Sequence, residues 1–183
     1  MSKRLGARSE PEASVEDAPA AHRAYAPTSL ACAVLTVSDT RTRADDRSGD
    51  LIEQQLVAAG HRVVERTIVP DEPAAVRAAV LRGIARREVD AVLATGGTGV
   101  SPRDGSVEAI EPLLYKRLEG FGELFRNLSL ADIGAAAQLS RAVAGTAGRT
   151  AVFLMPGSSG AVRLALERLI LPELPHVVGQ LRR

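Results

Sequence analysis

The chain of 183 residues contains one cysteine and no tryptophan. Because Cys32 stands alone, an internal disulfide and a zinc site built from cysteines are excluded, and a reducing, cytoplasmic setting is favoured. No apolar run reaches the roughly 18 to 20 residues that a membrane-spanning helix requires. Residues 1–27 also lack the continuous apolar centre of a signal peptide. We therefore expect a cytoplasmic protein with no membrane partner.

An excess of charge of one sign is missing too. The 23 Lys and Arg residues nearly match the 22 Asp and Glu residues, so charge alone indicates neither nucleic acid nor a membrane surface as a partner. Aromatic residues are few, and Phe121 and Phe125 share a helical spacing with Leu124 and Leu128. Such a stripe indicates core packing rather than base stacking. We expect no nucleic-acid partner.

Large apolar side chains are scarce in residues 1–28 and frequent after them. A segment of that composition cannot bury enough surface to offset its ordering entropy, so we expect residues 1–28 to form a disordered N-terminal tail. The remainder is long enough to bury one core and too short for two ordinary domains. We therefore expect a single domain over residues 29–183.

Within that domain, apolar runs of strand length alternate with segments of helical period, which is typical of an α/β fold with a mostly parallel sheet. The runs predict strands over residues 31–37, 62–69, 89–94 and 150–155. The helical periods predict helices over residues 50–59, 73–87, 106–114, 121–128, 160–170 and 172–181.

The third predicted strand runs directly into a glycine-rich turn, and this turn is the most informative stretch of the chain. Gly96, Gly97 and Gly99 can take positive φ and point successive N–H groups into one concavity, which suits phosphate oxygens. The sequence has neither the Gly-Lys-Ser/Thr end of a P-loop nor the third glycine of the dinucleotide pattern. A plain strand-to-helix connection remains open, but the polar side chains around the turn favour a ligand site. They are Thr95, Thr98, Ser101, Arg103 and Asp104.

Two other predicted strands end in polar residues. Ser38 and Asp39 follow the first strand, and Pro156, Gly157 and Ser158 follow the last. Because the carboxyl ends of parallel strands meet at one edge of a sheet, the three loops could surround one ligand. Ser158 would stand at a helix N-terminus, which favours an anion, although an ordinary N-cap fits equally well. For Asp39 the alternative is an acid in a surface turn.

Three acids are candidates for holding a divalent cation. Asp71 follows the second predicted strand and Asp104 the third, so both could reach one cleft, and Glu108 lies one helical turn after Asp104. Mg²⁺ prefers hard oxygen ligands and is usually held by one or two carboxylates together with substrate phosphates. Structural roles stay open for all three, as helix caps for Asp71 and Asp104 and as a solvated face for Glu108. The histidines are too scattered for a metal site, and we expect each of them at the surface.

Several of these motifs occur together in the order that is typical of one known family. The motifs are Val37-Ser-Asp-Thr40, Val69-Pro-Asp-Glu72, Thr95-Gly-Gly-Thr-Gly99 with Arg103-Asp104, Glu119-Gly-Phe-Gly-Glu123, Leu139-Ser-Arg-Ala142 and Met155-Pro-Gly157. From Leu30 to the C-terminus the chain resembles the MogA/MoaB family of molybdenum-cofactor biosynthesis, and the fourth and fifth motifs are closer to the MoaB branch.

The resemblance implies a three-layer α/β/α molybdopterin-binding domain that assembles as a homotrimer or hexamer. It also implies adenylylation of molybdopterin by MgATP with release of pyrophosphate, so ATP is a co-substrate and Mg²⁺ a cofactor. The essential acids of the family match Asp71 and Asp104, and its nucleotide-phosphate loop matches Gly96 to Gly99. By the same resemblance, the cleft would be lined by Ser38, Asp39, Ser140, Gly157 and Ser158.

One departure from the family pattern follows the glycine turn. Family members often have a threonine and a proline where this chain has Ser106 and Val107, so the first turn of the following helix is less rigid. Glu108 keeps the family's carboxylate, which leaves metal binding plausible. A protein of the MoaB branch that binds molybdopterin without turning it over is therefore the alternative to an adenylyltransferase.

Overall fold

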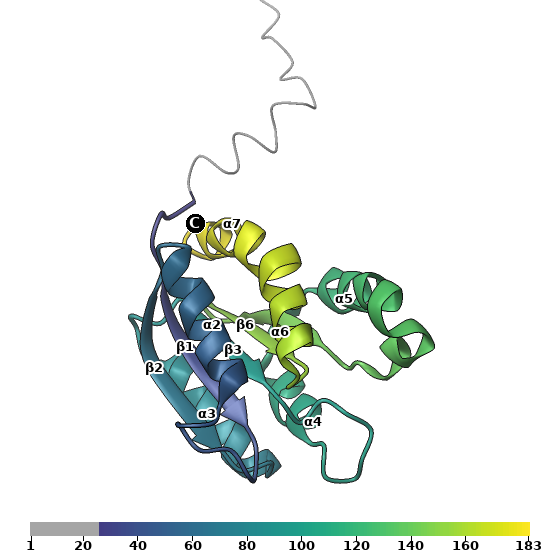
Figure 1. Ribbon diagram of the computed structural model, residues 1–183. Helices are drawn as coiled ribbons and strands as arrows, with labels where there is room; N and C mark the ends of the chain where they lie inside the picture. Colours follow the sequence, from purple (N-terminus) through teal and green to yellow (C-terminus); the bar gives the residue numbers. More distant parts are fainter. Residues whose placement is uncertain (1–25) are drawn as a thin grey trace, which may run out of the picture.

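The computed structural model describes residues 26–183, which form one six-stranded mixed sheet in the order β2-β1-β3-β6-β5-β4 (Figure 1). Strands β2, β1, β3 and β6 are parallel, whereas β5 and β4 run antiparallel to their neighbours at one edge. The bounds are β1 Ala31–Val37, β2 Arg62–Val69, β3 Ala91–Thr95, β4 Lys116–Arg117, β5 Val143–Ala147 and β6 Thr150–Met155. The predicted α/β fold with a mostly parallel sheet is confirmed. Of the predicted tail, residues 1–25 lie outside the described residues.

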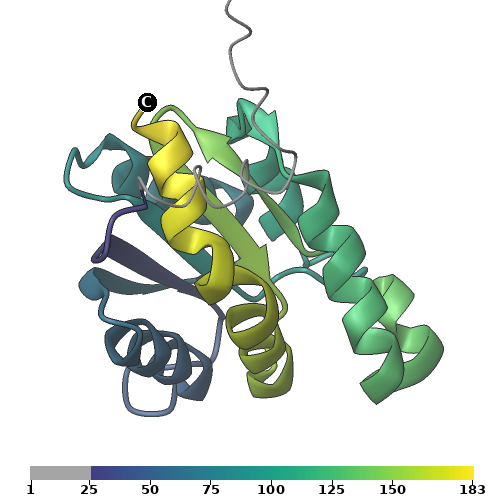
Figure 2. The ribbon, with the colours of Figure 1, turned by 90° about the horizontal axis from the view of Figure 1, so that it is seen from above.

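Helices cover both faces of the sheet, which makes the predicted three layers (Figures 1 and 2). One face carries α2, α5, α6 and α7, and the other carries α3 and α4. The bounds are α2 Arg47–Ala58, α3 Pro73–Ala85, α4 Ser106–Ile110, α5 Glu119–Ile133, α6 Ser159–Ala165 and α7 Leu171–Leu181. Short 3₁₀ segments follow α4 (Glu111–Leu113) and α5 (η2, Gly134–Leu139), and a π-helical turn, Leu166–Ile170, joins α6 to α7. None of the helices over residues 26–183 is long and apolar enough to cross a bilayer.

The central strands owe their apolar sequence to this burial from both sides. In β1, Cys32 and Val34 face one core while Ala33 and Leu35 face the other. A strand of that kind has no solvated face, so its sequence is continuously apolar instead of alternating. Every residue of β1, β3 and β6 is buried.

Several sequence predictions were wrong in detail. The antiparallel strands β4 and β5 were missed, because β4 has only two residues and β5 is built from small side chains. Leu124 is 54% exposed, so the predicted apolar stripe of α5 packs through Phe121 and Phe125 and not along its whole length. His61, expected at the surface, is 5% exposed because the turn from α2 to β2 places it against the core.

The strand order places the candidate loops at a switch point of the sheet. From β1 the chain passes to β2 on one side, and β3 then pairs with β1 on the other side. The loops after β1 and β3 therefore leave in different directions and open a crevice, the usual ligand position in open α/β sheets.

Candidate functional site

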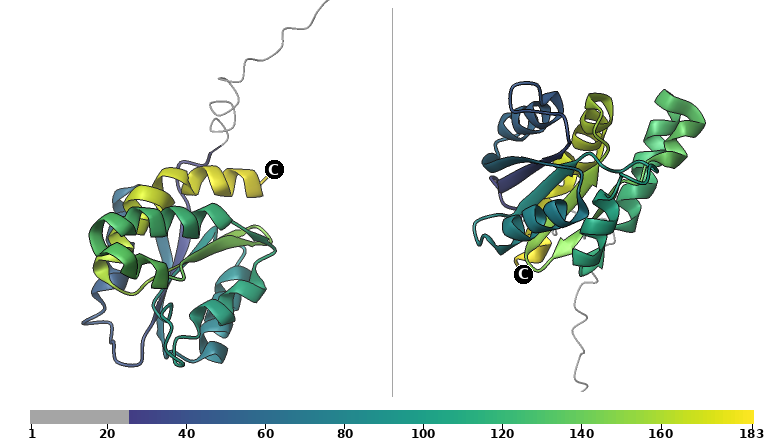
Figure 3. Two further views of the ribbon diagram at one scale, coloured as in Figure 1. Left: turned by 90° about the vertical axis from the view of Figure 1, so that its right-hand side faces the viewer. Right: turned by 90° about the horizontal axis from the view of Figure 1, so that it is seen from below.

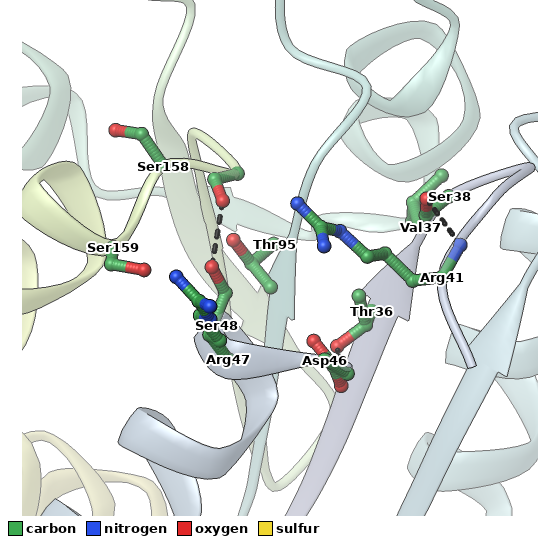
Figure 4. A pocket seen from close by; sticks show the side chains of 11 residues that line it. Thr36, Val37, Ser38, Arg41, Asp46, Arg47, Ser48, Thr95, Ser158 and Ser159 are labelled. Atoms are coloured by element: carbon green, nitrogen blue, oxygen red, sulfur yellow. Dashed lines mark hydrogen bonds between the residues drawn. The ribbon is translucent and has the colours of Figure 1, made fainter. Parts of the chain in front are cut away.

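The loops after β1, β3 and β6 enclose a cavity of about 310 Å³ at the carboxyl edge of the sheet (Figure 4). Of the predicted residues, Ser38, Thr95, Gly157 and Ser158 contribute to its wall. Thr95 is the last residue of β3, and neither Asp39 nor residues 96–99 of the glycine turn line the cavity. The remaining lining residues come from the end of β1, the loop that follows it, the start of α2 and the start of α6. They are Thr36, Val37, Arg41, Asp46, Arg47, Ser48 and Ser159.

Hydrogen bonds hold the walls of this cavity together. The Thr95 hydroxyl donates to the carbonyl of Pro156 at 2.9 Å, and the Ser48 hydroxyl donates to the carbonyl of Gly157 at 2.7 Å. Ser158 caps α6, because its side chain accepts from the N–H of Ala161 at 3.2 Å. The ordinary N-cap that the sequence left open for Ser158 is therefore present, and ligand contact would use its exposed side.

Two arginines at this cavity were missed by sequence reasoning. Figure 4 shows Arg41 extending from the loop after β1 into the cavity and Arg47 lying at the start of α2. Arg47 was missed because α2 was predicted from residue 50, whereas Arg41 lies in the polar loop after the first predicted strand and was not chosen as a site residue. In the structure Asp46 is the N-cap, so helix begins at Arg47. The usable signal was Asp46, because an aspartate is a favoured N-cap residue. Its side chain accepts a hydrogen bond from the N–H of Gly49, three residues later, at 2.9 Å.

The glycine turn after β3 has the backbone geometry predicted for two of its three glycines. Gly96 has φ +103° and Gly97 φ +63°, and a Cβ on Gly97 would lie 2.2 Å from the Ser106 Oγ. Gly99 does not have positive φ; it is needed because a Cβ there would lie 2.6 Å from Asp104 Oδ2. Within residues 26–183 the N–H groups of Gly97, Thr98 and Gly99 donate to no protein acceptor. These donors are free for an anion.

Asp71 and Asp104 meet at this turn from the two strands predicted to carry them. The Cβ position of Gly97 is 2.8 Å from Asp71 Oδ1, and that of Gly99 is 2.6 Å from Asp104 Oδ2. Burial, together with the negative charges of Asp104 and Asp39, raises the pKa of Asp71. Hydrogen bonding from Gly105 and the Arg103 charge oppose this rise only in part. The site therefore concentrates negative charge that a cation would relieve.

Asp39 joins three loops to one another. Its carboxylate accepts two hydrogen bonds from Arg103, both at 3.0 Å, and one from the N–H of Asp71 at 3.1 Å. Arg103 also pairs with Glu72 at 3.1 Å. The Arg103 hydrogen bonds, followed by that of Asp71, lower the pKa of Asp39. Asp39 is thus more than a surface turn acid, because it fixes the glycine turn to the ends of β1 and β2.

Glu108 lines an open hollow with Asp104, but Asp71 does not line it. The Glu108 carboxylate pairs with Arg141, which lowers the pKa of Glu108. Because α4 begins at Ser106, Asp104 precedes the helix and the predicted shared helical face is wrong. No group of three or more His, Cys, Asp or Glu side chains arranged to hold a metal ion occurs within residues 26–183. A cation here would depend on Asp71 and Asp104 with oxygens from a ligand.

The two aspartates nevertheless fit a magnesium ion. Asp71 Oδ1 and Ser106 Oγ are both buried without a hydrogen-bond partner, and both face Gly97. Neither aspartate caps a helix, since the N-caps of α3 and α4 are Glu72 and Gly105 and neither helix start has a side-chain cap. Two hard carboxylates beside free phosphate-binding N–H groups are the donor set that Mg²⁺ usually has in nucleotide sites.

The remaining predicted residues lie around the same edge but not in one cavity. Thr98 is buried and Ser101 lines an open hollow of about 450 Å³ together with Asp104 and Glu108. Ser140 lines a separate hollow beside Arg126 and Arg141. The structure therefore does not bring Ser140 into the cavity formed by the loops after β1, β3 and β6.

Comparison with known proteins agrees with this geometry. Residues 33–176 match the family described as "Probable molybdopterin binding domain". The chain is 52% identical over 163 residues to molybdenum cofactor biosynthesis protein B of Bacillus anthracis, covering 88% of this chain and 96% of that protein. A crystal structure of molybdenum cofactor biosynthesis protein B has a TM-score of 0.84 at 52% identity, over 86% of this chain and 99% of that one. The tungsten cofactor synthesizing protein MoaB from Pyrococcus furiosus has a TM-score of 0.78 at 38% identity, over 86% and 100%. The chain therefore belongs to the molybdopterin-binding-domain family, among the MoaB members of molybdenum-cofactor biosynthesis.

Proposed function

We propose that this chain transfers the adenylyl group of ATP to the terminal phosphate of molybdopterin, with Mg²⁺ as cofactor and pyrophosphate as the second product. The observation that carries the proposal is the meeting of Asp71 and Asp104 at the free N–H groups of Gly97, Thr98 and Gly99. Two carboxylates beside free amide donors suit a magnesium-chelated polyphosphate. The names of the relatives, which concern molybdenum and tungsten cofactor biosynthesis, support molybdopterin as the acceptor.

The residues divide the work between binding and charge. The N–H groups of residues 97–99 bind phosphate oxygens, while Ser38, Thr95 and Arg41 line the cavity that receives the rest of a ligand. When bound to Asp71 and Asp104, the ion neutralises charge on the polyphosphate. An oxygen of the molybdopterin phosphate forms a bond to the α-phosphorus, and the bond from that phosphorus to the leaving pyrophosphate oxygen breaks. The attacking phosphate is already anionic, so no general base is required.

A protein that only binds molybdopterin is the second candidate. The observation in its favour is that Glu108 pairs with Arg141, which leaves two carboxylates for the ion instead of three. Val107 stands where family members often have proline, whose fixed φ would hold the start of α4. This helix start is therefore more flexible.

The experiment that separates the two candidates is an assay for adenylylated molybdopterin. The purified chain is incubated with molybdopterin and ATP, with and without Mg²⁺, beside D104N and the matched control D132N, whose parent acid is exposed on α5. We expect Mg²⁺-dependent product, a loss of roughly a hundredfold in D104N, and wild-type turnover in D132N. Tight molybdopterin binding without any product would establish the binding protein instead.

A further inference from the structure

Arg141 follows η2 and lies outside the three loops that form the cavity, yet it binds the segment 98–104 at two points and helix α4 at a third. Its Nε donates to the carbonyl of Thr98 at 3.1 Å, and its Nη2 donates to the carbonyl of Asp104 at 3.0 Å. Its Nη1 donates to the carboxylate of Glu108, which also receives Nη2 at 3.4 Å. The two carbonyls lie at the ends of the segment 98–104. The Arg141 side chain therefore fixes the distance between Thr98 and Asp104.

The attachment of Arg141 to the sheet makes it a fixed support. Ala142 and Val143, which follow it, are buried, and Val143 begins β5. A guanidinium group donates in several directions from one rigid plane, which lysine cannot do. Glu108 is exposed on the outer side of that plane and supplies the opposite charge.

We propose that Arg141 is a positioning residue that holds the glycine N–H groups and the Asp104 carboxylate at a fixed spacing, and that Glu108 orients Arg141 instead of binding magnesium. The kinetic part of this inference rests on the proposed adenylyl transfer. The structural part does not, because it concerns the order of residues 98–104 and the ligands of the ion in the chain without molybdopterin.

The structural part is tested by amide hydrogen exchange of the ligand-free chain. We expect R141M to exchange the hydrogen-bonded amides of Ser101, Arg103 and Asp104 about tenfold faster or more, while those of β1 and β3 keep their rates. The matched control is R163M, which removes an exposed arginine of α6 whose one ion pair within residues 26–183 is with Glu167. Unchanged exchange of these three amides in R141M would overturn the positioning role.

The role of Glu108 is tested by calorimetric titration of the chain with ATP in the presence of Mg²⁺. Gln can still accept from Arg141, so E108Q should keep the affinity within about threefold, whereas D104N should lose tenfold or more. An equal loss in E108Q and D104N would make Glu108 a magnesium ligand and overturn the inference, whether or not the chain is a transferase.

Given transferase activity, kinetics add a further readout. Because the N–H groups and the carboxylate that Arg141 positions also bind the polyphosphate, R141M should lower kcat by about tenfold or more and also raise KM for ATP. R141K keeps the charge but cannot reach all three partners, so it should recover only part of kcat. Full recovery by lysine would show that charge alone matters and would contradict the geometric role.

Discussion

At the scale of single residues, Asp71 is held in a way that serves the site at a cost to stability. The pKa of Asp71 is higher in the folded chain than its ordinary value of 3.8. At pH values above 3.8, ionisation of Asp71 therefore disfavours folding. Asn cannot ionise, so we expect D71N to have a Tm at pH 7 at least as high as that of the parent chain. This difference should shrink as pH falls through the raised pKa toward 3.8, where the parent carboxyl is protonated in both states.

Thermal unfolding followed by circular dichroism at several pH values measures this difference. The same variant should lose Mg²⁺-dependent ATP binding, so stability and binding change in opposite directions. A lower Tm of D71N than of the parent chain at pH 7 would mean that the carboxylate stabilises the fold, contrary to this account.

Gly97 is the residue of the glycine turn at which substitution by alanine should be most destabilising. Alanine there would need φ near +63° and would place its Cβ 2.2 Å from Ser106 Oγ and 2.8 Å from Asp71 Oδ1. We expect G97A to lose about 1–2 kcal/mol of unfolding free energy, with greatly weakened ATP binding. Urea unfolding and calorimetry measure the two effects. G120A is the control, since a Cβ there meets nothing within 4 Å; equal behaviour of the two variants would exclude this role for Gly97.

At the scale of elements, Arg66 of β2 fixes the start of α2 beside the cavity. Its side chain is 4% exposed and pairs with Asp46, the buried N-cap of that helix, at 2.8 Å. It also pairs with Asp50 and Glu53 of α2 at 2.5 and 2.9 Å. Burial alone would raise the pKa of Asp46, but the hydrogen bonds from Arg66, Gly49 and Thr36 lower it overall. The arginine therefore keeps a buried negative charge in place.

Replacing Arg66 should lower the free energy of unfolding more than replacing an exposed arginine. We expect R66M to lose about 3–5 kcal/mol of unfolding free energy, because Asp46 is left charged and unpaired in the interior. R43M removes an exposed partner of Glu53 and should cost less than about 1 kcal/mol. Urea denaturation measures both variants, and a loss in R66M no larger than that in R43M would contradict the argument.

The elements that the sequence predicted well are those with a strong local pattern. The strands over 31–37, 62–69 and 150–155 have the predicted bounds. The first and last are apolar runs that stop at a polar residue or a turn, and the second ends at Pro70. The strands β4 and β5 could not be predicted, because β5 pairs with β6 and β4 with β5, and this pairing does not depend on a pattern in their own side chains.

At the site, too, features with a local sequence pattern could be predicted and long-range contacts could not. Three loops, two aspartates and a glycine turn could be placed together, because the parallel strand ends dictate their meeting. The contacts of Arg141 with Thr98 and Glu108 could not, since they join segments 43 and 33 residues apart and depend on side-chain direction. The resemblance to a family supplied the motifs that contain them but not these contacts.

At the scale of the whole molecule, α5 packs on the sheet through Phe121 and Phe125, whereas its C-terminal end and the following 3₁₀ segment η2 project beyond the sheet (Figure 3). Leu130 and Ile133 of α5 and Leu139 of η2 are each more than half exposed. The expected homotrimer or hexamer is a proposal, and burial of these apolar side chains between copies would stabilise it. We expect the double variant L130D/I133D to be smaller than the parent chain in light scattering, and V57D, altered on α2, to keep the parent size. A monomeric parent chain, or assembly of L130D/I133D like the parent, would contradict this proposal.

The central claim is that the glycine turn and two aspartates hold a magnesium-chelated polyphosphate at the carboxyl edge of the sheet. A crystal structure with Mg²⁺, molybdopterin and α,β-methylene ATP, which cannot release pyrophosphate, tests it most directly. The account predicts an oxygen of Asp71 or Asp104 at about 2.1 Å from the ion, and phosphate oxygens that accept from the N–H groups of residues 97–99. A triphosphate bound elsewhere, such as the arginine-lined hollow beside Arg86 and Arg149, or an ion that contacts neither aspartate, would contradict it.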